Sequence, residues 1–518
     1  MIKKVLIANR GEIALRIVRA CRELGIRSVA VYSDADGAAP HVRAADEAVH
    51  IGPAAASESY LRGDHLIEVA KQVGADAIHP GYGFLSEREW FAKAVREAGL
   101  IWIGPPAEAI AAMGSKTAAR TLAISAGTPV VPGTTKALKD AAEAKKLAQQ
   151  FGLPVLLKAA AGGGGKGMRV VRELTEIEGA LGAAQRESKN AFGDDAVYIE
   201  KYIEGPRHVE IQVLADMHGN CISLGERECS IQRRHQKMIE EAPSVAVSPA
   251  LRKKMGDAAV AAAKAAGYVN AGTCEFLLDK NGDFYFLEMN TRIQVEHPVT
   301  ELVMGIDLVQ WQLRIAQGEK LPITETPEPQ GWAIECRITS EDPANGFLPS
   351  TGRITHLQLP AGPGVRWDGG ITTGSEVGLS YDPMLAKLIV HAPSRELAIA
   401  RMERALRELV IFGVETSREF HLRMMADPDY RSGNVTIQWL EQKLPEILAL
   451  RPSADSQRAL AIAAALLAEA DRGSKPQMGA PTTAGAAPQG GAGIPGPGGV
   501  PSTTRTAWTD LARREGLR

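Results

Sequence analysis

The order of apolar and polar residues predicts alternating strands and helices near the N-terminus. KVLIA and RSVAVYS are short apolar runs that predict strands, and GEIALRIVRACRELG between them has apolar residues at helical spacing. ADAIHP and LIWIGPP continue the alternation. Strands that alternate with helices are typical of a parallel sheet, so residues 1–115 are expected to form a parallel α/β domain.

The middle of the chain follows other patterns. Over 116–203 the strands PVLLKA, MRVVR and AVYIEKYI occur among helical stretches, which predicts a smaller domain. From HVEIQVLAD to residue 330, antiparallel strands and hairpins are expected, with helices near 249–267 and 300–317. The segment ITETPEPQG separates this part from a last mixed domain, 331–446.

The end of the chain has a different character. Residues 447–472 are predicted to be a helical extension, with an Ala- and Leu-rich helix at about 456–471. Residues 473–504 are almost entirely Gly, Pro, Ala, Ser and Thr without periodicity, which predicts a flexible tether. In 505–518, Trp508, Leu511 and Ala512 have helical spacing, so this short segment is either a docking helix or a frayed tail.

The composition is that of a globular protein with several domains. At 518 residues the chain is too long for one core. Its net charge of −2 gives no general attraction to nucleic acid or to a membrane. Five cysteines without a C-x-x-C pair argue against a disulfide framework or a zinc site and favour a reducing compartment. Because there is no signal-peptide pattern and no apolar run that could span a bilayer, a cytoplasmic protein is expected.

The run TCEFLLDKNGDFYFLE, 273–288, predicts a hairpin in which two carboxylates face each other. Asn281-Gly282 is a preferred two-residue type I′ turn, and with that loop Glu275 falls opposite Glu288. Facing carboxylates repel, but a divalent cation would bind both of them, and Asn290 adds an amide oxygen on the same face. The apolar run 284–287 indicates a strand buried on both faces, so a metal site is favoured over an exposed acidic hairpin.

This run continues with polar residues at every second position. Side chains alternate faces along a strand, so one face would carry Glu288, Asn290, Arg292, Gln294 and Glu296. At about 3.3 Å per residue the row would span roughly 26 Å when extended, too far for a single pocket. The chain is therefore expected to leave regular strand geometry near Arg292.

A glycine-rich stretch, LPVLLKAAAGGGGKGMRVV, 153–171, predicts a loop that approaches an anion. Lys158 and Lys166 add positive charge to it. The dinucleotide-binding fingerprint requires a helix where a strand follows here, and Met168 stands where the Walker motif has its lysine. A glycine loop between two strands is instead typical of a flap over nucleotide phosphates; the alternative is a plain flexible hairpin.

The segment GERECSIQRRHQKMIEEAPS, 225–244, concentrates basic residues, namely Arg233, Arg234, His235 and Lys237. Acidic residues flank them and aromatic residues for base stacking are absent, which disfavours a nucleic-acid site. A catalytic basic cluster is favoured, with a solvated run of charges as the alternative.

Seven motifs together resemble those of the biotin carboxylases, the ATP-grasp component of biotin-dependent carboxylases. They are ANRGEIA (8–14), HPGYGFLSE (79–87), GGGGKGM (162–168), EKYIEGPRHVEIQV (200–213), ERECSIQRRHQK (226–237), EMNTRIQVEHPVTE (288–301) and ECRITSEDP (335–343). The resemblance covers roughly residues 1–446. It implies a multidomain α/β and α+β fold: the N-terminal domain, an ATP-grasp small domain with a lid at about 130–203, an ATP-grasp catalytic domain at 204–330, and a C-terminal biotin carboxylase domain.

The resemblance also implies the residues that bind ATP and metal. Lys116 and Lys158 would hold the phosphates beneath a flap made of Gly162, Gly163, Gly164, Gly165, Gly167 and Met168. The adenine would lie among Glu200, Lys201, Tyr202, Ile203 and Leu277, with His208, Gln232 and His235 along the nucleotide. Two magnesium or manganese ions would be held by Glu275, Glu288 and Asn290.

By the same resemblance, the remaining site residues act on bicarbonate and biotin. Lys237, Arg292, Gln294 and the backbone of Val295 would bind bicarbonate, Glu296 would be the general base, and Arg337 would face the biotin ring near Tyr82. Lys237, Arg292, Glu296 and Arg337 would be the catalytic residues. No Met-Lys-Met motif for attached biotin occurs, so biotin is expected on a separate carrier protein, with a carboxyltransferase as a further partner and a homodimer as the assembly.

Two other functions compete with this one. Another ATP-grasp ligase would share the flap, the lysines and the acid pair, but would not need the row Arg292, Gln294 and Glu296 or Arg337. A non-catalytic scaffold would be expected to lack at least one of the residues Lys116, Lys158, Glu275, Glu288, Arg292 and Glu296, and all of them are present. Which acyl-CoA or keto acid is finally carboxylated is left open by the sequence.

Overall fold

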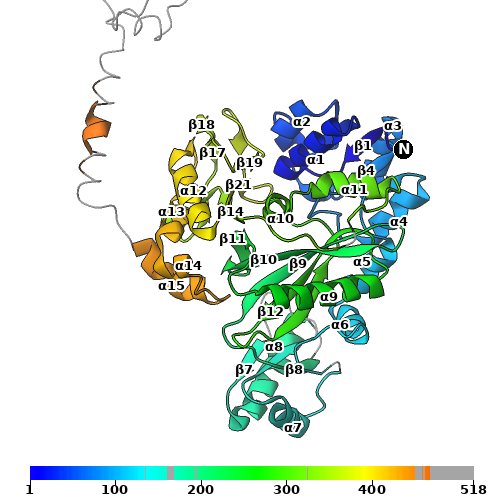
Figure 1. Ribbon diagram of the computed structural model, residues 1–518, viewed down its shortest axis with the longest axis vertical. Coiled ribbons are helices and arrows are strands. Elements are labelled where there is room, and N and C mark those ends of the chain that lie inside the picture. Colours follow the sequence, from blue (N-terminus) through cyan, green and yellow to red (C-terminus); the bar gives the residue numbers. More distant parts are fainter. Residues whose placement is uncertain are drawn as a thin grey trace, which may run out of the picture. The chain divides into compact units, whose positions relative to one another are not determined.

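A computed structural model describes residues 1–134, 136–159, 168–192, 195–323 and 325–449, and beyond them 458, 461–466 and 469. The chain divides into two units, Met1–Leu450 and Arg451–Arg518. The few described residues of the second unit are helical, within the helix expected at about 456–471. The predicted tether 473–504 and the terminal segment 505–518 lie outside the described residues. The elements named below all belong to the first unit (Figure 1).

The N-terminal region confirms the predicted parallel α/β fold. Its five strands have the order β3-β2-β1-β4-β5 and are all parallel: Glu47–His50, Arg27–Tyr32, Lys4–Ile7, Ala77–His79 and Ile101–Trp102. The helices that accompany them are α1 (Gly11–Glu23), α2 (Pro40–Ala44), α3 (Gly63–Gln72), α4 (Glu89–Glu97) and α5 (Ala107–Gly114). Helix α1 buries Ile13 and Ile17 in the same core as Leu308 and Leu313 of α11 (Leu308–Ala316), so segments far apart in sequence lie side by side (Figure 1).

A small antiparallel sheet forms a separate lobe (Figure 1). It consists of β7 (Met168–Val171), β6 (Val155–Ala159) and β8 (Val197–Lys201), in that order. Helices α7 (Ala141–Phe151) and α8 (Ile177–Phe192) pack on it around a core of their own that includes Leu157, Leu181 and Ile199. The three strands are the ones that the sequence predicted.

The largest sheet has eight strands in the order β13-β12-β9-β10-β11-β14-β21-β19. They are Phe284–Asn290, Asn270–Leu278, Arg207–Ala215, Cys221–Arg233, Gln236–Ala242, Trp332–Thr339, Met384–Ala392 and Val365–Gly369. Helix α9 (Pro249–Ala265) packs against β9 and β10, and α12 (Arg395–Glu408) against β14 and β21. The predicted boundary at residue 330 divides this sheet, because β11 before it and β14 after it are hydrogen-bonded neighbours. The predicted domains 204–330 and 331–446 therefore share one sheet.

Shorter elements complete the unit. Helix α6 (Lys116–Ser125) follows the N-terminal region, and α10 (His297–Met304) precedes α11, with Gly305 in the left-handed conformation between them. The helical stretch expected near 300–317 is therefore two helices, whereas α9 confirms the helix expected near 249–267. The C-terminal part adds small strand pairs and helices: β15–β16 (Glu341–Asp342, Leu348–Pro349), β17–β20 (Gly352–Arg353, Glu376–Val377), β18–β22 (His356–Gln358, Val410–Phe412), α13 (Arg418–Ala426), α14 (Pro428–Ser432) and α15 (Trp439–Ala449).

The β12–β13 hairpin pairs Glu275 with Glu288 as predicted, but through a different turn. The predicted two-residue turn at Asn281-Gly282 is wrong, because the Gly282 amide donates to the Asp279 carbonyl at 3.2 Å and the Asp279 amide donates to the Asp283 carbonyl at 2.8 Å. This is a three-residue loop ending in Gly282 at φ 89°, and the Asp279 carboxylate stabilises it by accepting from two backbone amides. A shift of register between Glu275 and Phe276 then restores the predicted pairing.

Strand β13 differs from the predicted strand in its burial. It lies at the edge of the sheet, and Leu287 is 39% exposed, so the apolar run 284–287 is not buried on both faces. Leu287 falls within the register shift and faces a cleft. The strand ends at Asn290, two residues before Arg292, which confirms that the chain leaves strand geometry there.

Two further observations concern the class of protein. Within the part of the chain that the structure describes, no helix is both long enough and apolar enough to cross a membrane. The five cysteines are all among the described residues, and each is a free thiol.

Candidate active site

A cleft of about 1190 Å³ lies where the N-terminal region, the small sheet and the large sheet meet. It gathers most of the side chains that the sequence predicted. Those that line it are Tyr82, Lys158, Met168, Glu200, Lys201, Tyr202, Ile203, His208, Gln232, His235, Lys237, Glu275, Leu277, Glu288, Asn290, Arg292, Gln294, Val295 and Arg337. The flap glycines Gly162, Gly163, Gly164, Gly165 and Gly167 lie outside the described residues, as does the side chain of Lys116.

Lys237, near the start of β11, is the centre of a buried ionic cluster. Its Nζ lies 2.6 Å from Glu210 Oε2, 2.7 Å from Glu296 Oε1 and 3.0 Å from Glu275 Oε1. Burial disfavours the ammonium, but the three carboxylates outweigh it and raise the pKa of Lys237 well above its usual value. The lysine is therefore a fixed positive charge shared by acids from three different elements.

Glu296 stands at the N-cap of α10, completely buried behind Lys237. Its Oε2 accepts a hydrogen bond from Arg337 Nη2 at 3.0 Å, and its Oε1 accepts from Lys237. Burial favours the neutral acid, yet Lys237 and Arg337 together hold the pKa of Glu296 well below its usual range. A carboxylate fixed as an anion between two cations is thus present where the sequence placed a base.

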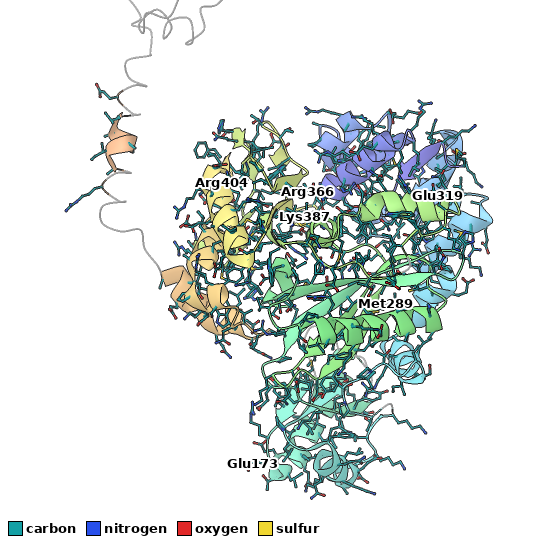
Figure 2. The ribbon with its side chains drawn as sticks, viewed as in Figure 1. Glu173, Met289, Glu319, Arg366, Lys387 and Arg404 are labelled. Carbon is teal, nitrogen blue, oxygen red and sulfur yellow. The ribbon has the colours of Figure 1, made fainter. Side chains whose placement is uncertain are left out.

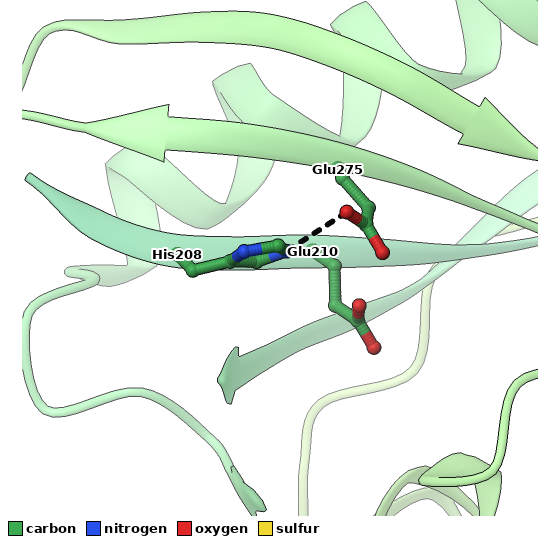
Figure 3. Close-up of side chains that lie close together, drawn as sticks. All are labelled: His208, Glu210 and Glu275. Atoms are coloured by element: carbon green, nitrogen blue, oxygen red, sulfur yellow. Dashed lines mark ion pairs between the residues drawn. The ribbon is translucent and has the colours of Figure 1, made fainter. Parts of the chain in front are cut away.

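Glu275 joins the predicted metal ligands to the predicted bicarbonate ligands. Its Oε1 accepts from Asn290 Nδ2 at 2.9 Å and from Gln294 Nε2 at 3.0 Å, besides Lys237. Its Oε2 lies 3.0 Å from His208 Nε2 (Figure 3). Burial raises the pKa of Glu275, but Lys237 and His208 outweigh burial and lower it well below its usual value. The polar row therefore curves around one carboxylate, as expected of residues that share a pocket.

Arg292 lies beside this group and is held from the N-terminal region. Its Nε donates to Glu87 Oε2 at 3.0 Å, and its Nη atoms donate to Asn290 Oδ1 and Gln294 Oε1, each at 3.1 Å. Glu87 also accepts from the Thr291 amide at 3.2 Å. Glu87 thereby fixes the turn at which the chain leaves β13.

Arg337 projects from β14 toward Glu296 on the far side of the cluster. Its Nε donates to Glu240 Oε1 at 2.6 Å, so two carboxylates hold the guanidinium. The Tyr82 hydroxyl donates to Glu12, and Asn9 donates to the carbonyls of Pro80 and Tyr82, which anchors the loop that carries Tyr82. Tyr82 and Arg337 both line the cleft, as the sequence led us to expect.

Several residues of the cluster were missed by sequence reasoning: Glu87, Glu210, Arg227 and Glu240. Arg227 is fully buried and donates to Glu210, to Gln212 Oε1 at 2.7 Å and to Thr300 Oγ1 at 2.9 Å. His208, Glu210 and Gln212 alternate along β9 as the polar residues of the row alternate near β13. That alternation within EKYIEGPRHVEIQV could have revealed Glu210.

The residues proposed to hold metal are suited to a hard cation. Glu275 and Glu288 are register partners on neighbouring strands, and Asn290 lies beside Glu275, with its amide oxygen accepting from Arg292. A second cluster of possible ligands is formed by His208, Glu210 and Glu275 (Figure 3). It is less suitable, because Lys237 Nζ already contacts both Glu210 and Glu275. The pair Glu275 and Glu288 stays the predicted cation site, although Lys237 also contacts Glu275.

The other end of the cleft is formed by the small sheet. Lys158 Nζ lies 2.6 Å from Glu200 Oε2, and Arg120 Nη1 lies 3.6 Å from Glu200 Oε1. Lys201 Nζ donates to the carbonyls of Gly152 and Leu153, at 2.8 and 3.1 Å. Each cation at this end therefore has one or two partners, fewer than Lys237 has.

The basic segment is divided between structural and cleft-lining roles. Arg233 is buried against Glu341 at 2.9 Å and stacks on Phe347, while Arg234 and His235 form the β10–β11 turn with positive φ. Lys237 and His235 face the cleft. Because Arg233 and Lys237 are committed to buried acids, the segment is neither a solvated run of charges nor a basic nucleic-acid surface.

A small sheet and a large antiparallel sheet that close on a cleft of lysines, arginines and paired acids define an ATP-grasp enzyme. Three family models match the chain in succession: "Biotin carboxylase, N-terminal domain" over 1–110, "Carbamoyl-phosphate synthase L chain, ATP binding domain" over 115–324 and "Biotin carboxylase C-terminal domain" over 335–442. The chain belongs to the biotin carboxylase family, whose members are ligases.

Several known relatives are matched by this chain over nearly their whole length. Biotin carboxylase 1 of Bacillus subtilis is 54% identical over 443 residues, which are 85% of this chain and 98% of the relative. A solved biotin carboxylase subunit of pyruvate carboxylase is 49% identical with a TM-score of 0.80, covering 87% of this chain and 100% of that one. The biotin carboxylase domain dimer of Hydrogenobacter thermophilus 2-oxoglutarate carboxylase, solved with MgADP, ADP and bicarbonate, is 47% identical with a TM-score of 0.79, covering 87% of this chain and 100% of that one.

Proposed function

We propose that this chain uses ATP and bicarbonate to carboxylate biotin, the first half-reaction of a biotin-dependent carboxylase. The observation that carries the proposal is the position of Glu296, an anion held between Lys237 and Arg337 beside Arg292 and Gln294. An ATP-grasp ligase for another substrate would need the cleft and its lysines but not a base between these two cations.

ATP binds across the small sheet in this proposal. Lys158, Lys116 and the glycine loop hold the phosphates, while Glu200, Lys201, Tyr202, Ile203 and Leu277 surround the adenine, with His208, Gln232 and His235 along the nucleotide. Lys158 exchanges its ion pair with Glu200 for the phosphates. Glu275, Glu288 and Asn290 hold magnesium or manganese, which when bound neutralises the charge of the phosphates.

Bicarbonate binds at the inner end, where Lys237, Arg292, Gln294 and the backbone of Val295 are directed into the cleft. Glu296 takes the bicarbonate proton, and the freed oxygen attacks the γ-phosphorus, which releases ADP and gives carboxyphosphate. When Lys237 and Arg337 turn from Glu296 toward the substrate, they lower the pKa of Glu296 less, so its basicity rises as the reaction requires.

Biotin is carboxylated in the second step. Carboxyphosphate divides into CO₂ and phosphate, the phosphate removes the proton from the ureido nitrogen, and that nitrogen attacks CO₂. Arg337 stabilises the ureido enolate, a planar anion suited to a guanidinium, beside Tyr82. The cleft excludes the water that would hydrolyse carboxyphosphate.

The partners belong to the same proposal. Biotin arrives on a carrier protein, a carboxyltransferase consumes the carboxybiotin, and the chain forms a homodimer. The solved relatives support this assembly, since one belongs to a pyruvate carboxylase and another is a domain dimer from a 2-oxoglutarate carboxylase. The carboxyltransferase selects the molecule that finally accepts the carboxyl group, and the two relatives come from carboxylases named for different acceptors.

The test is ATP hydrolysis with magnesium and bicarbonate, with and without free biotin, in the wild type and in Glu296→Gln. Biotin should stimulate hydrolysis, and Glu296→Gln should lower kcat by about 10² to 10⁴. Glu241→Gln is the matched control, because Glu241 is a buried glutamate on β11 that pairs with Arg395 instead. Hydrolysis indifferent to biotin and stimulated by an amine would favour a different ligase.

A further inference from the structure

A second pair of facing carboxylates lies directly behind Arg337. Glu240 of β11 and Glu335 of β14 are register partners in the large sheet, and neither side chain is exposed to solvent. Partners in an antiparallel ladder have Cβ atoms about 5 Å apart. Glu335 and Arg337 stand two residues apart on the same face of β14, so the pair adjoins the guanidinium.

Helix α10 covers the face of the large sheet that carries Glu240 and Glu335. Its Val299 and Val303 pack on Ala242, Ala333 and Ile389, which flank the two glutamates along β11, β14 and β21. Both carboxyl groups are therefore enclosed between the sheet and an apolar helix face.

The two carboxyl groups have few hydrogen-bond partners. Glu240 Oε1 accepts from Arg337, but Glu240 Oε2 and both oxygens of Glu335 accept no hydrogen bond from the described residues. A buried ionised carboxylate in such a state would be unfavourable, because nothing replaces its hydration.

The cations nearby are committed to other acceptors. Arg337 serves Glu240 and Glu296. Lys387, which faces Arg337 across β14 and β21 inside the unit (Figure 2), donates to the Val295 carbonyl at 2.7 Å and lies 3.2 Å from Glu12. Neither cation forms a hydrogen bond to Glu335.

The charges around the pair do not balance. The titratable groups nearest to it are Lys237 on β11, Arg337 on β14, Lys387 on β21, Glu296 at the start of α10, and Glu12 and Tyr82 from the N-terminal region, whereas the Cys336 thiol lies on the opposite face of β14. Lys237 already serves Glu210, Glu275 and Glu296, which leaves Arg337 and Lys387 for the carboxyl groups of Glu12, Glu240 and Glu335. Three buried carboxyl groups therefore share two cations, and Glu335, which has no hydrogen bond from the described residues, is the least able to carry a negative charge.

We propose that Glu240 and Glu335 hold one proton between them in the resting enzyme, with Glu335 as the neutral acid, and that this proton limits the negative charge around Arg337. Glu335 is then a positioning residue that acts through Arg337. If Glu335 were ionised, another buried anion would compensate the guanidinium and weaken its attraction for the biotin enolate. This functional consequence rests on the proposed role of Arg337, whereas the protonation itself does not.

The direction of the two pKa values agrees with this assignment. Burial raises the pKa of Glu335 well above its usual value, and the opposing effects of Lys387 and Arg337 do not offset it. Burial also raises the pKa of Glu240, to about 7, although Arg337 lowers it. Because the two groups interact, the proton belongs to the pair, with Glu335 holding it more strongly.

The first test is infrared spectroscopy of the full-length protein with isotope-labelled glutamate. The carbonyl stretch of a protonated carboxylic acid should be present near neutral pH and absent in Glu335→Gln. Glu241→Gln, which removes a buried glutamate paired with Arg395, should retain the band. A band that is absent from the wild type, or that survives in Glu335→Gln, would overturn the proposal.

The second test is unfolding as a function of pH, which needs no activity. A group whose pKa is raised by folding destabilises the native state increasingly as pH rises from its ordinary value of 4.5 to its folded value. Glu335→Gln should therefore gain stability relative to the wild type as pH rises through this range, and the gain should then level off. A variant that is least stable relative to wild type at neutral pH would mean that Glu335 is ionised in the native state.

The third test is the pH profile of biotin-stimulated ATP hydrolysis. Near neutral pH, Glu335→Gln should keep kcat within about threefold of wild type, because a neutral amide replaces a neutral acid. At alkaline pH it should retain stimulation that the wild type loses, with hydrolysis in the absence of biotin unchanged. Parallel profiles would overturn the role of the proton in the biotin step. Failure of biotin to stimulate either protein would count against the proposed function, while the infrared band would still decide the protonation.

Discussion

At the inner end of the cleft the Lys237 side chain is 12% exposed and contacts three carboxylates, whereas at the outer end Lys158 is 37% exposed and contacts one. Both lysines line the same cleft, and both are proposed to meet phosphate or bicarbonate oxygens. The inner lysine belongs to an eight-stranded sheet and the outer one to a separate three-stranded sheet with its own core.

The difference agrees with the proposed roles of the two ends, catalysis at the inner end and ATP binding at the outer end. At the inner end Glu296, Arg337 and Lys237 each have several partners, so they are held close to one another before substrate arrives and need only small movements to reach it. At the outer end the Lys158 side chain is 37% exposed and Glu200 is its ion-pair partner, so solvent screens the lysine and it can exchange Glu200 for phosphate at a lower cost. Substitutions should therefore affect folding and chemistry at the inner end and mainly nucleotide binding at the outer end.

The largest effect should come from Lys237→Met. It leaves Glu210, Glu275 and Glu296 without their shared cation, which should lower the free energy of unfolding by about 3 to 5 kcal/mol in denaturant titrations at neutral pH. Lys237 lowers the pKa of Glu296 in the folded state. The stability that this ion pair contributes is present above the unfolded pKa of 4.5 and is lost as pH falls toward the folded value. The deficit of the variant should shrink as pH falls below 4.5. A deficit independent of pH would contradict the role of these ion pairs.

Lys158→Met, the matched change at the outer end, should leave the free energy of unfolding within about 1 kcal/mol of wild type. The expected loss is in kcat/KM for ATP, about tenfold to a hundredfold, since one charge-assisted contact to phosphate is removed. Steady-state kinetics with varied ATP and denaturant titrations measure the two effects. Destabilisation equal to that of Lys237→Met would remove the contrast between the two ends.

Glu87→Gln tests the contact by which the N-terminal region holds Arg292. Glu87 is 42% exposed, so solvent screens the pair and about 1 kcal/mol is expected, or roughly a fivefold rise in KM for bicarbonate. The KM for ATP should not change. If the KM for ATP changed and the KM for bicarbonate did not, Glu87 would act on the ATP-binding end of the cleft and not through Arg292.

The smallest effect is expected for Arg169→Ala on the small sheet. Arg169 and Glu187 form an ion pair in which both side chains are more than a third exposed, so the free energy of unfolding should change by less than about 0.5 kcal/mol. Kinetic parameters for ATP and bicarbonate should stay at wild-type values. A loss comparable to that of Lys158→Met would show that the rigidity of the small sheet contributes to ATP binding.

The β12–β13 hairpin illustrates how sequence reasoning can succeed and fail in one element. The assumed two-residue turn led to the correct pairing of Glu275 with Glu288, because a register shift compensates for the longer loop, and the length of the polar row correctly predicted that the chain leaves the strand near Arg292. The turn was wrong because the Asp279 carboxylate accepts from the Asn281 and Asp283 amides and stabilises a longer loop. The burial of Leu287 was also wrong, since an apolar run can face a ligand cleft as well as a core.

The ionic cluster was predicted only in part. Lys237 stood out in a basic segment, Glu275 through the predicted hairpin pairing and Glu296 through the alternating polar row, and the resemblance to biotin carboxylases supplied their roles. Arg227, Glu210, Glu240 and Glu335 are ordinary polar residues of strands when read along the chain. Their burial and pairing depend on which strands become neighbours.

By itself, the sequence determined the elements, the parallel and antiparallel classes of sheet, and the local row from Glu288 to Glu296, because hydrophobic period and turn residues act over a few positions. Only the tertiary structure decided that β11 lies between β10 and β14, which brings Glu240 against Glu335 and Arg337 against Glu296. The state of a buried charge depends on the partners and the dielectric around it, and these arise from contacts between residues far apart in the chain.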